Sequence, residues 1–377
     1  APAIVFMIWY KAGSRDEQPG KTGLAHMLEH MMFRGTSKYG PKEFSNIVQR
    51  NGGSHNAFTS FDYTAYFERI ASDRLELVTE MEADRMVNLV LKEEEFYPER
   101  DVVLEERRSR TEDRPSGKVF EMLNAKAFRY HTYGNPIIGW ENDIRNYTVE
   151  DLRAFYKKYY APNNATVIIV GDFQVDEAIR LLKKHFGAIP PRPIELPAVL
   201  PEPIQTEERR LTIRKEAQLP YISLAHHVPN WKHEDAPALL MLEFLLGGGE
   251  TSRLHQRLVR KDALTLSVGV DYTSIAREPR LFYIFAQVAP GKKTDQVEKV
   301  IEEEINLLIE KGISEKEMTL SLRGLEARTV FAMDSHFFRA MLLGRAHIAG
   351  DWRQLERHLP DIAEVTTDDV IRVAKKY

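Results

Sequence analysis

Residues 148–159 read TVEDLRAFYKKY, and residues 366–377 read TTDDVIRVAKKY. Both segments begin with a Thr-x-x-Asp pattern, which is typical of a helix N-cap, and both end in Lys-Lys-Tyr. The offset in sequence number between them is 366 − 148 = 218. A second pair is AHMLEHMMFRGT at 25–36 and LMLEFLLGGGE at 240–250, whose shared Met-Leu-Glu triplets differ in number by 241 − 27 = 214. Two matches at nearly the same offset predict an internal duplication.

A proline-rich segment separates the two similar halves. Residues 190–203 read PPRPIELPAVLPEP and carry six prolines, which exclude regular helix and favour extended chain. The chain has 377 residues, which is too long for one ordinary hydrophobic core. We therefore expect a metal-binding domain at 1–189, a linker at 190–208 and a homologous second domain without metal ligands at 209–377.

Each half mixes strand patterns with amphipathic helix patterns. Short apolar or alternating runs predict strands at 3–10, 63–70, 165–171, 209–215, 221–227, 266–273 and 280–288. Apolar residues at helical spacing predict helices at 22–33, 41–51, 73–90, 98–113, 148–159 and 174–186. Because the helices come in runs between strands, we expect an α+β fold with an antiparallel sheet in each half. In the first half Lys-Lys-Tyr leads into a strand, so we expect the polypeptide to continue beyond Tyr377 as well.

The composition excludes several classes of function. Apolar residues make up 43% of the chain and charged residues 29%, which is ordinary for a globular protein. The net charge of −4, with no basic run among aromatics, argues against nucleic acid as a partner. No apolar run approaches the roughly 18–20 residues of a membrane span. The chain has no cysteine, so any metal site must use histidine and carboxylate ligands.

Residues 26–30 read His-Met-Leu-Glu-His within the predicted helix 22–33. His26 and His30 are four residues apart, so their rings project from one helix face and can bind one zinc ion. Glu29 can point toward the same space, where it is better suited to act on the attacking water than to be a third ligand. The pattern is H-x-x-E-H, the inverse of the more common H-E-x-x-H.

A third ligand is needed, and the helix that we expect to start at Pro98 is the best source. Glu99, Glu106 and Arg110 fall within about 40° of one another on a helical wheel, on a partly apolar face. Glu105 points about 100° away, although it stays the alternative in a charge-rich segment. We choose Glu106 as the ligand and Glu99 as a carboxylate that supports the site.

Three stretches carry a specific resemblance. GSRDEQPGKTGLAHMLEHMMFRGT (13–36), NGGSHNAFTSFDYTAYF (51–67) and ERDVVLEERRSR (99–110) resemble the pitrilysin, or M16-type, family of inverzincin metallopeptidases. They are most similar to its branch of roughly half-length subunits, which includes mitochondrial processing peptidase and bacterial relatives. In that family a zinc-binding Glu follows the H-x-x-E-H motif at a characteristic spacing. Glu106 stands at that spacing from His30, since 106 − 30 = 76.

The resemblance implies a fold and a mechanism. The fold would be two similar α+β halves that form a clamshell. The cofactor would be Zn²⁺, which lowers the pKa of a water to about 7, and Glu29 would take the proton of that water. In the family an Asn-Ala strand pairs with the backbone of an extended substrate, which corresponds to Asn56 and Ala57 here. The substrates would be peptides or unstructured segments.

The second half departs from the family pattern at two positions. Active members carry an Arg and a Tyr seven residues apart, where this chain has Val259 and Leu266. Neither side chain can donate a hydrogen bond to a substrate carbonyl, and Arg260 is turned by about 100° on a helix. We therefore expect a heterodimer in which a homologous partner subunit supplies the Arg/Tyr pair.

Two other classes of function stay open. One is a proteolytically silent structural subunit, which Val259 and Leu266 favour mildly and the intact metal motif disfavours. The other is a module that binds peptides without cleaving them. The histidines at 226, 227 and 233 could suggest a second metal, but no carboxylate stands in helical register with them, so we expect none there.

Overall fold

The computed structural model describes residues 2–377 apart from 196 and 198. These residues form two compact units, each assembled from three segments of the chain. The first unit comprises Ala1–Asp113, Phe128–Glu207 and Ser335–Gly344, and the second comprises Arg114–Ala127, Glu208–Asp334 and Arg345–Tyr377. Each unit has its own hydrophobic core.

The first unit is built on a four-stranded antiparallel sheet in the order β2-β3-β1-β4. The strands are β1 (Ala3–Tyr10), β2 (Ser54–Thr59), β3 (Thr64–Ala71) and β4 (Ala165–Gly171). The main helices of this unit are α1 (Leu24–Met31), α2 (Glu43–Arg50), α3 (Leu75–Val87), α4 (Glu93–Arg107), α6 (Glu141–Asn146), α7 (Val149–Tyr159) and α8 (Val175–Phe186). In this order β2 is an edge strand, paired on one side with β3.

Both faces of the first sheet are covered. Tyr66 of β3 points to the face covered by α1, and its ring centroid lies 6.2 Å from that of Phe33, which follows this helix. The next residue, Phe67, points the other way because side chains alternate along a strand. Its ring meets that of Phe337, at 4.8 Å between centroids. Phe337 belongs to α12 (His336–Ala349), so the beginning of this late helix covers the sheet face opposite α1.

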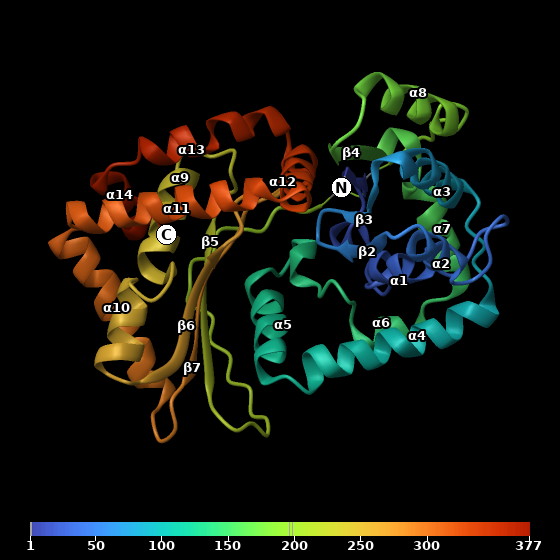
Figure 1. Ribbon diagram of the computed structural model, residues 1–377. Helices are drawn as coiled ribbons and strands as arrows, with labels where there is room; N and C mark the ends of the chain where they lie inside the picture. Colours follow the sequence, from blue (N-terminus) through green and yellow to red (C-terminus); the bar gives the residue numbers. More distant parts are fainter. Residues whose placement is uncertain (1, 196, 198) are drawn as a thin grey trace. The chain divides into compact units, whose positions relative to one another are not determined.

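The second unit is built on a three-stranded antiparallel sheet in the order β5-β7-β6. The strands are β5 (Tyr221–Val228), β6 (Thr265–Tyr272) and β7 (Arg280–Val288). The helices are α5 (Pro115–Ala127), α9 (Ala236–Gly247), α10 (Thr294–Lys311), α11 (Glu315–Asp334), α13 (Leu355–Ala363) and α14 (Thr367–Lys376), with the end of α12. Figure 1 shows α5 on one face of this sheet and α9 and α10 on the other.

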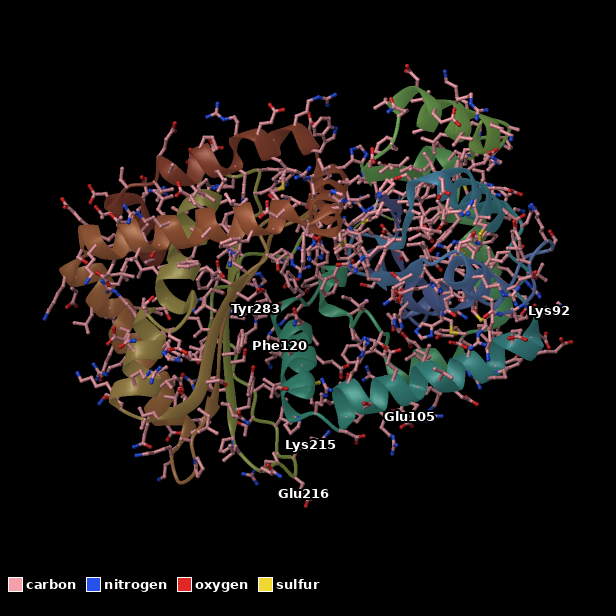
Figure 2. The ribbon with its side chains drawn as sticks, viewed as in Figure 1. Lys92, Glu105, Phe120, Lys215, Glu216 and Tyr283 are labelled. Carbon is pink, nitrogen blue, oxygen red and sulfur yellow. The ribbon has the colours of Figure 1, made fainter. Side chains whose placement is uncertain are left out.

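Aromatic side chains hold α5 against its sheet. The ring of Phe120 lies 5.7 Å from that of Tyr283 on β7 and 5.6 Å from that of Phe285, between centroids. Figure 2 shows Phe120 and Tyr283 facing each other from the two elements. The Tyr283 hydroxyl also donates a hydrogen bond to Asn124 Oδ1 at 2.6 Å. Helix α5 therefore belongs physically to the second unit although its sequence lies in the first half.

The duplication predicted from the sequence is confirmed by the order of elements. The sheet β6-β7-β5 repeats β2-β3-β1, and helices α10 to α14 follow β7 as α3 to α7 follow β3. On this alignment α9 is the counterpart of α1, and α12 is the counterpart of α5. The two counterparts α5 and α12 are the elements that pack in the unit of the other half. The α+β fold class is confirmed, but the sequence did not indicate this reciprocal exchange.

Two local predictions were wrong. Residues 209–215 form no strand; Arg209 instead donates hydrogen bonds to the carbonyls of Lys126 and Ala127, at the end of α5. Figure 2 shows Lys215 and Glu216 at the tip of the extended segment that follows. The helix expected to start at Pro98 begins at Glu93, because three successive acidic residues favour a helix N-terminus. Among the described residues, no helix is long and apolar enough to span a membrane.

Candidate metal centre

Helix α1 presents the H-x-x-E-H motif from its first two turns. The helix follows Gly23, whose φ of 90° lies in the left-handed region. Leu24, Met27 and Leu28 are buried in the core of the first unit. That apolar face fixes the rotation of the helix, so that His26, Glu29 and His30 point away from the core together.

The three candidate ligands converge. His26 Nε2 lies 3.7 Å from Glu106 Oε1, and His30 Nε2 lies 3.3 Å from Glu106 Oε2. One ligand atom from each residue can be chosen so that all three lie within 4.8 Å of one another. Tetrahedral zinc with bonds of about 2.0–2.1 Å needs its ligand atoms roughly 3.4 Å apart. The set of two imidazoles and one carboxylate therefore fits zinc with small adjustments.

Helix α4 supplies Glu106 and turns Glu105 away. Glu105 forms an ion pair with Arg108 at 2.7 Å, and its side chain is 63% exposed. Figure 2 shows Glu105 on the outer side of α4. Glu106 is much less exposed, and its Oε1 lies 2.7 Å from Arg110 Nη1. The structure therefore brings Glu106, not Glu105, to the two histidines, as the helical wheel predicts.

Glu99 lies seven residues, or about two helical turns, before Glu106, and it contacts the ring nitrogen of His30 that faces away from Glu106. His30 Nδ1 lies 2.8 Å from Glu99 Oε1. Arg34 forms an ion pair with the other oxygen of Glu99. A carboxylate on the second ring nitrogen fixes the tautomer and orientation of a metal-binding histidine. The structure therefore places Glu99 on the second ring nitrogen of His30.

The two histidines have opposite protonation tendencies in the metal-free site. Burial lowers the pKa of His26 to about 4, and the nearby His30 adds to this. Burial would also lower the pKa of His30, but hydrogen bonds to Glu106 and Glu99 raise it to about 9. Burial raises the pKa of Glu106, yet His30, His26 and Arg110 together hold it below its ordinary value. His26 is therefore neutral at pH 7, while His30 carries a proton shared with its carboxylates.

Glu29 is placed as a base beside the cluster. Its Oε2 accepts a hydrogen bond from the Thr59 hydroxyl at 2.5 Å. Burial raises the pKa of Glu29 above its ordinary value, and the Thr59 bond partly offsets this. A carboxyl group with a raised pKa accepts and returns protons readily near neutral pH.

The edge strand β2 carries the residues expected to bind substrate. Ala57 and Thr59 lie on the face of the sheet that meets α1, whereas Asn56 points to the other face. Asn56 Oδ1 accepts a hydrogen bond from the Ala57 N–H at 2.9 Å. The structure thus links the Asn-Ala pair to Glu29 through Thr59, two residues further along the same strand.

Three polar residues at the site were not singled out as functional from the sequence. They are Arg34 on Glu99, Thr59 on Glu29 and Arg110 on Glu106. Arg34 follows His30 by four residues, so helical spacing could have found it. Thr59 follows Ala57 by two residues in a strand, which is also a readable signal. Arg110 lies in the π-helical turn Arg108–Glu112, which the sequence did not predict.

The other histidines form no comparable cluster. Among the described residues, His26, His30 and Glu106 make up the one group of three His, Cys, Asp or Glu side chains near enough to hold a metal. His227 Nε2 lies 3.3 Å from the Ala127 carbonyl oxygen, and His233 Nδ1 accepts from the Asp235 N–H. These histidines therefore serve the structure of the second unit.

Comparison with known proteins places the chain in a family. Residues 2–141 match the family model described as insulinase (peptidase family M16), and residues 146–325 match the peptidase M16 inactive domain. The zinc protease PqqE of Helicobacter pylori is 35% identical over 98% of this chain and 84% of the relative. The chain belongs to peptidase family M16. The resemblance inferred from the three sequence stretches is thereby confirmed.

Two solved structures extend the comparison to the M16 fold. A protease from Helicobacter pylori superposes with a TM-score of 0.97 at 34% identity, covering 100% of this chain and 92% of that one. The periplasmic protease PqqL of Escherichia coli superposes with a TM-score of 0.80 at 18% identity. This chain covers only 44% of PqqL, so the likeness there is one of fold, to less than half of a longer protein.

Proposed function

We propose that this M16 protein is a zinc-dependent endopeptidase whose metal is held by His26, His30 and Glu106. The observation that carries the proposal is the convergence of these three side chains, with Glu29 beside them. The donor set suits zinc because it combines two imidazole nitrogens with one carboxylate. The names of the curated relatives, zinc proteases, support the same metal.

The residues around the candidate metal ligands have different roles in the proposed reaction. A bound zinc ion would polarise the scissile carbonyl and lower the pKa of a coordinated water. Glu29 takes the proton of the attacking water and later returns it to the leaving amine, a role for which its raised pKa is suited. Thr59 fixes the carboxylate of Glu29, and Glu99 fixes the ring of His30.

Strand β2 supports recognition of extended peptides. It is the edge strand of its sheet, so its outer backbone groups can pair with a further strand. Asn56 and Ala57 would then contact the substrate backbone, and Asn56 Oδ1 would give up the Ala57 N–H that it now accepts. Because the adjacent Thr59 contacts Glu29, a peptide paired with β2 would run past the catalytic base.

We further propose that the chain works as the metal-bearing subunit of a heterodimer. Leu266, on the edge strand β6, is 54% exposed and has no hydrogen-bonding side chain. Arg260 cannot easily replace the missing Arg, because its guanidinium is paired with Glu250 at 2.7 Å. The fold likeness to 44% of PqqL is consistent with a fold that also occurs joined to a further part in one chain.

The peptidase proposal is tested with the purified chain, zinc and an unstructured peptide. Wild-type protein alone should release fragments slowly, and Glu29→Gln should lose at least about 100-fold of that rate while still binding one zinc ion. Equal fragment release by the two proteins would refute the role of Glu29. A wild-type chain that binds no zinc would refute the metal site itself.

The heterodimer proposal needs a separate measurement. The chain is assayed alone and with a homologous M16 chain that carries the Arg and Tyr seven residues apart. We expect the mixture to exceed the sum of the separate activities by at least about tenfold. Full turnover by this chain alone would contradict the heterodimer but not the peptidase. A chain that binds zinc but cleaves nothing with any partner would instead favour the silent structural subunit.

A further inference from the structure

The two histidines of the metal centre are supported unequally. His30 has Glu99 on its second ring nitrogen, at 2.8 Å. His26 Nδ1 is buried and makes no hydrogen bond. A metal-binding histidine usually gains its orientation from a partner on this nitrogen. The position of His26 must therefore be fixed by other means.

His26 stands at the third position of α1, inside the first helical turn. Backbone N–H groups in a first turn have no partner within the helix, and an unsatisfied first turn frays. The N-cap residue is Gly23, which has no side chain with which to cap them. Fraying of this first turn would therefore also displace the ring of His26.

Glu17 supplies the missing cap from outside the helix. Its Oε2 accepts the Gly23 N–H and its Oε1 accepts the Ala25 N–H, each at 2.8 Å. Glu17 is only 4% exposed, so both bonds are shielded from water. Ala25 is the residue immediately before His26, and the carboxylate also lies at the positive end of the helix.

The chain around this cap leaves little room for movement. A Cβ atom at Gly23 would lie 2.5 Å from the Ile138 carbonyl oxygen, so the backbone of Gly23 is packed directly on the next segment. In that segment, the Gly139 carbonyl accepts a hydrogen bond from Arg107 Nη1 at 2.9 Å. Arg107 follows Glu106 directly on α4. The start of α1 is thus linked through Gly139 to the residue next to the third ligand.

We infer that Glu17 is a positioning residue for the metal centre, which holds His26 through the backbone as Glu99 holds His30 through its ring. The inference rests on the proposed zinc site. It predicts that the capping bonds of Glu17 contribute to metal affinity and not only to stability.

The corresponding helix of the second unit, α9, has an acidic residue at its own N-cap position. Asp235 precedes α9 and is fully buried, but makes no side-chain cap bond to the helix. Its carboxylate instead binds Arg372, Lys376 and the Tyr377 hydroxyl, which joins α9 to α14.

The test compares zinc binding in Glu17→Gln with that of the wild-type chain. An amide presents one acceptor oxygen and no charge, so one of the two N–H groups loses its partner. We expect zinc to bind about tenfold more weakly, measured by competition with a chelator, and the absorption spectrum of the cobalt-substituted protein to change. Glu17→Asp keeps two carboxyl oxygens with a shorter reach, and serves if the Gln variant does not fold.

A matched control separates positioning from general stability. Thr366→Ala removes the side-chain cap of α14 in the second unit, where Thr366 accepts the Asp369 N–H. It should lower the melting temperature of the metal-free protein without changing zinc affinity. Unchanged zinc affinity and an unchanged cobalt spectrum in the Glu17 variants, with only a lower melting temperature, would overturn the inference. If the wild-type chain binds no zinc, the proposed function fails instead.

Discussion

Helices α1 and α9 occupy the same place in the two repeats but carry different polar groups. When Glu29 is aligned with Glu243, His26 corresponds to Leu240 and His30 to Phe244. The glutamate is kept in both, whereas an aliphatic and an aromatic residue replace the histidines. Packing on the sheet is therefore retained, and among the residues that the structure describes the candidate metal ligands lie in the first unit.

The facing helices differ in a complementary way. In the first unit α4 brings Glu106 to the histidines. In the second, α11 brings Arg328 to Glu243, at 3.4 Å between Nη2 and Oε2. Gly324 of α11 makes room for Phe244, because a Cβ there would lie 2.1 Å from the ring. The aligned glutamates thus have different partners: Glu243 pairs with an arginine in the second unit, whereas Glu29 accepts a hydrogen bond from Thr59 beside the candidate metal ligands in the first.

The sharpest test of this comparison is to remove the glutamate from each helix. Glu29→Gln should reduce peptide cleavage by at least about 100-fold, because it removes the proton acceptor. Glu243→Gln is the matched control, and should leave turnover within about twofold. Cleavage rates with a fluorogenic unstructured peptide measure both. Equal losses in the two variants would show that the two helices do not differ in function.

The next prediction concerns the proton that zinc would displace from the candidate metal centre. Among the described residues, α9 carries no such centre. In metal-free protein the pKa of His30 is raised to about 9, so zinc must displace one proton at pH 7. Apparent zinc affinity should rise about tenfold per pH unit between about 7 and 9 and then level off. Calorimetry in buffers of different ionisation enthalpy counts the proton released.

The raised pKa of His30 also makes the stability of the metal-free protein depend on pH. Because the folded pKa of His30 lies above its ordinary value of 6.5, its contribution to metal-free stability is fully present below about pH 6.5. It is lost as the pH rises through about 9. Glu99→Gln removes one of the carboxylates that raise this pKa, so both pH dependences should shift to lower pH. Zinc binding without proton release at pH 7 would contradict the assignment.

A smaller effect is expected at Arg328, the arginine that pairs with Glu243 in the second unit. Arg328→Leu leaves Glu243 buried without its countercharge, which should cost about 1–2 kcal/mol of unfolding free energy. The double variant Glu243→Leu/Arg328→Leu should recover most of this loss. Denaturant unfolding measures both. Arg323→Leu, an exposed position on the same helix, is the control and should change stability by less than about 0.5 kcal/mol.

The smallest effect lies at the start of α11. Burial alone would raise the pKa of Glu317, but hydrogen bonds from Arg253 and the Ser314 N–H lower this pKa to about 2. Its contribution is present above its ordinary pKa of 4.5 and is lost as the pH falls through about 2. Glu317→Gln should lower the free energy of unfolding by up to about 1 kcal/mol at pH 7. The variant should also lose less stability than the wild type as the pH falls. Glu326→Gln, exposed on the same helix, should leave the acid unfolding curve unchanged.

Much of the candidate site could be predicted from the sequence because it rests on helical geometry. The spacing of His26, Glu29 and His30 follows from 3.6 residues per turn, and so does the choice of Glu106 over Glu105. The Glu99 contact follows from a seven-residue step on the same face. Each of these is a relation within one helix, which local periodicity determines.

The contacts between elements could not be predicted in the same way. Thr59 meets Glu29, and Glu17 meets the first turn of α1, only because separate chain segments pack side by side. The exchange of α5 and α12 between the units depends on which sheet each helix packs against, and neither helix is among those predicted from the sequence.

The sequence by itself determined the duplication, the α+β class and the set of candidate metal-binding residues, since these depend on residue types at fixed spacing. The tertiary structure alone decided which helix covers which sheet, how β2 is linked to Glu29, and what fixes each histidine. These depend on burial and on hydrogen bonds between separate segments, which no local pattern records.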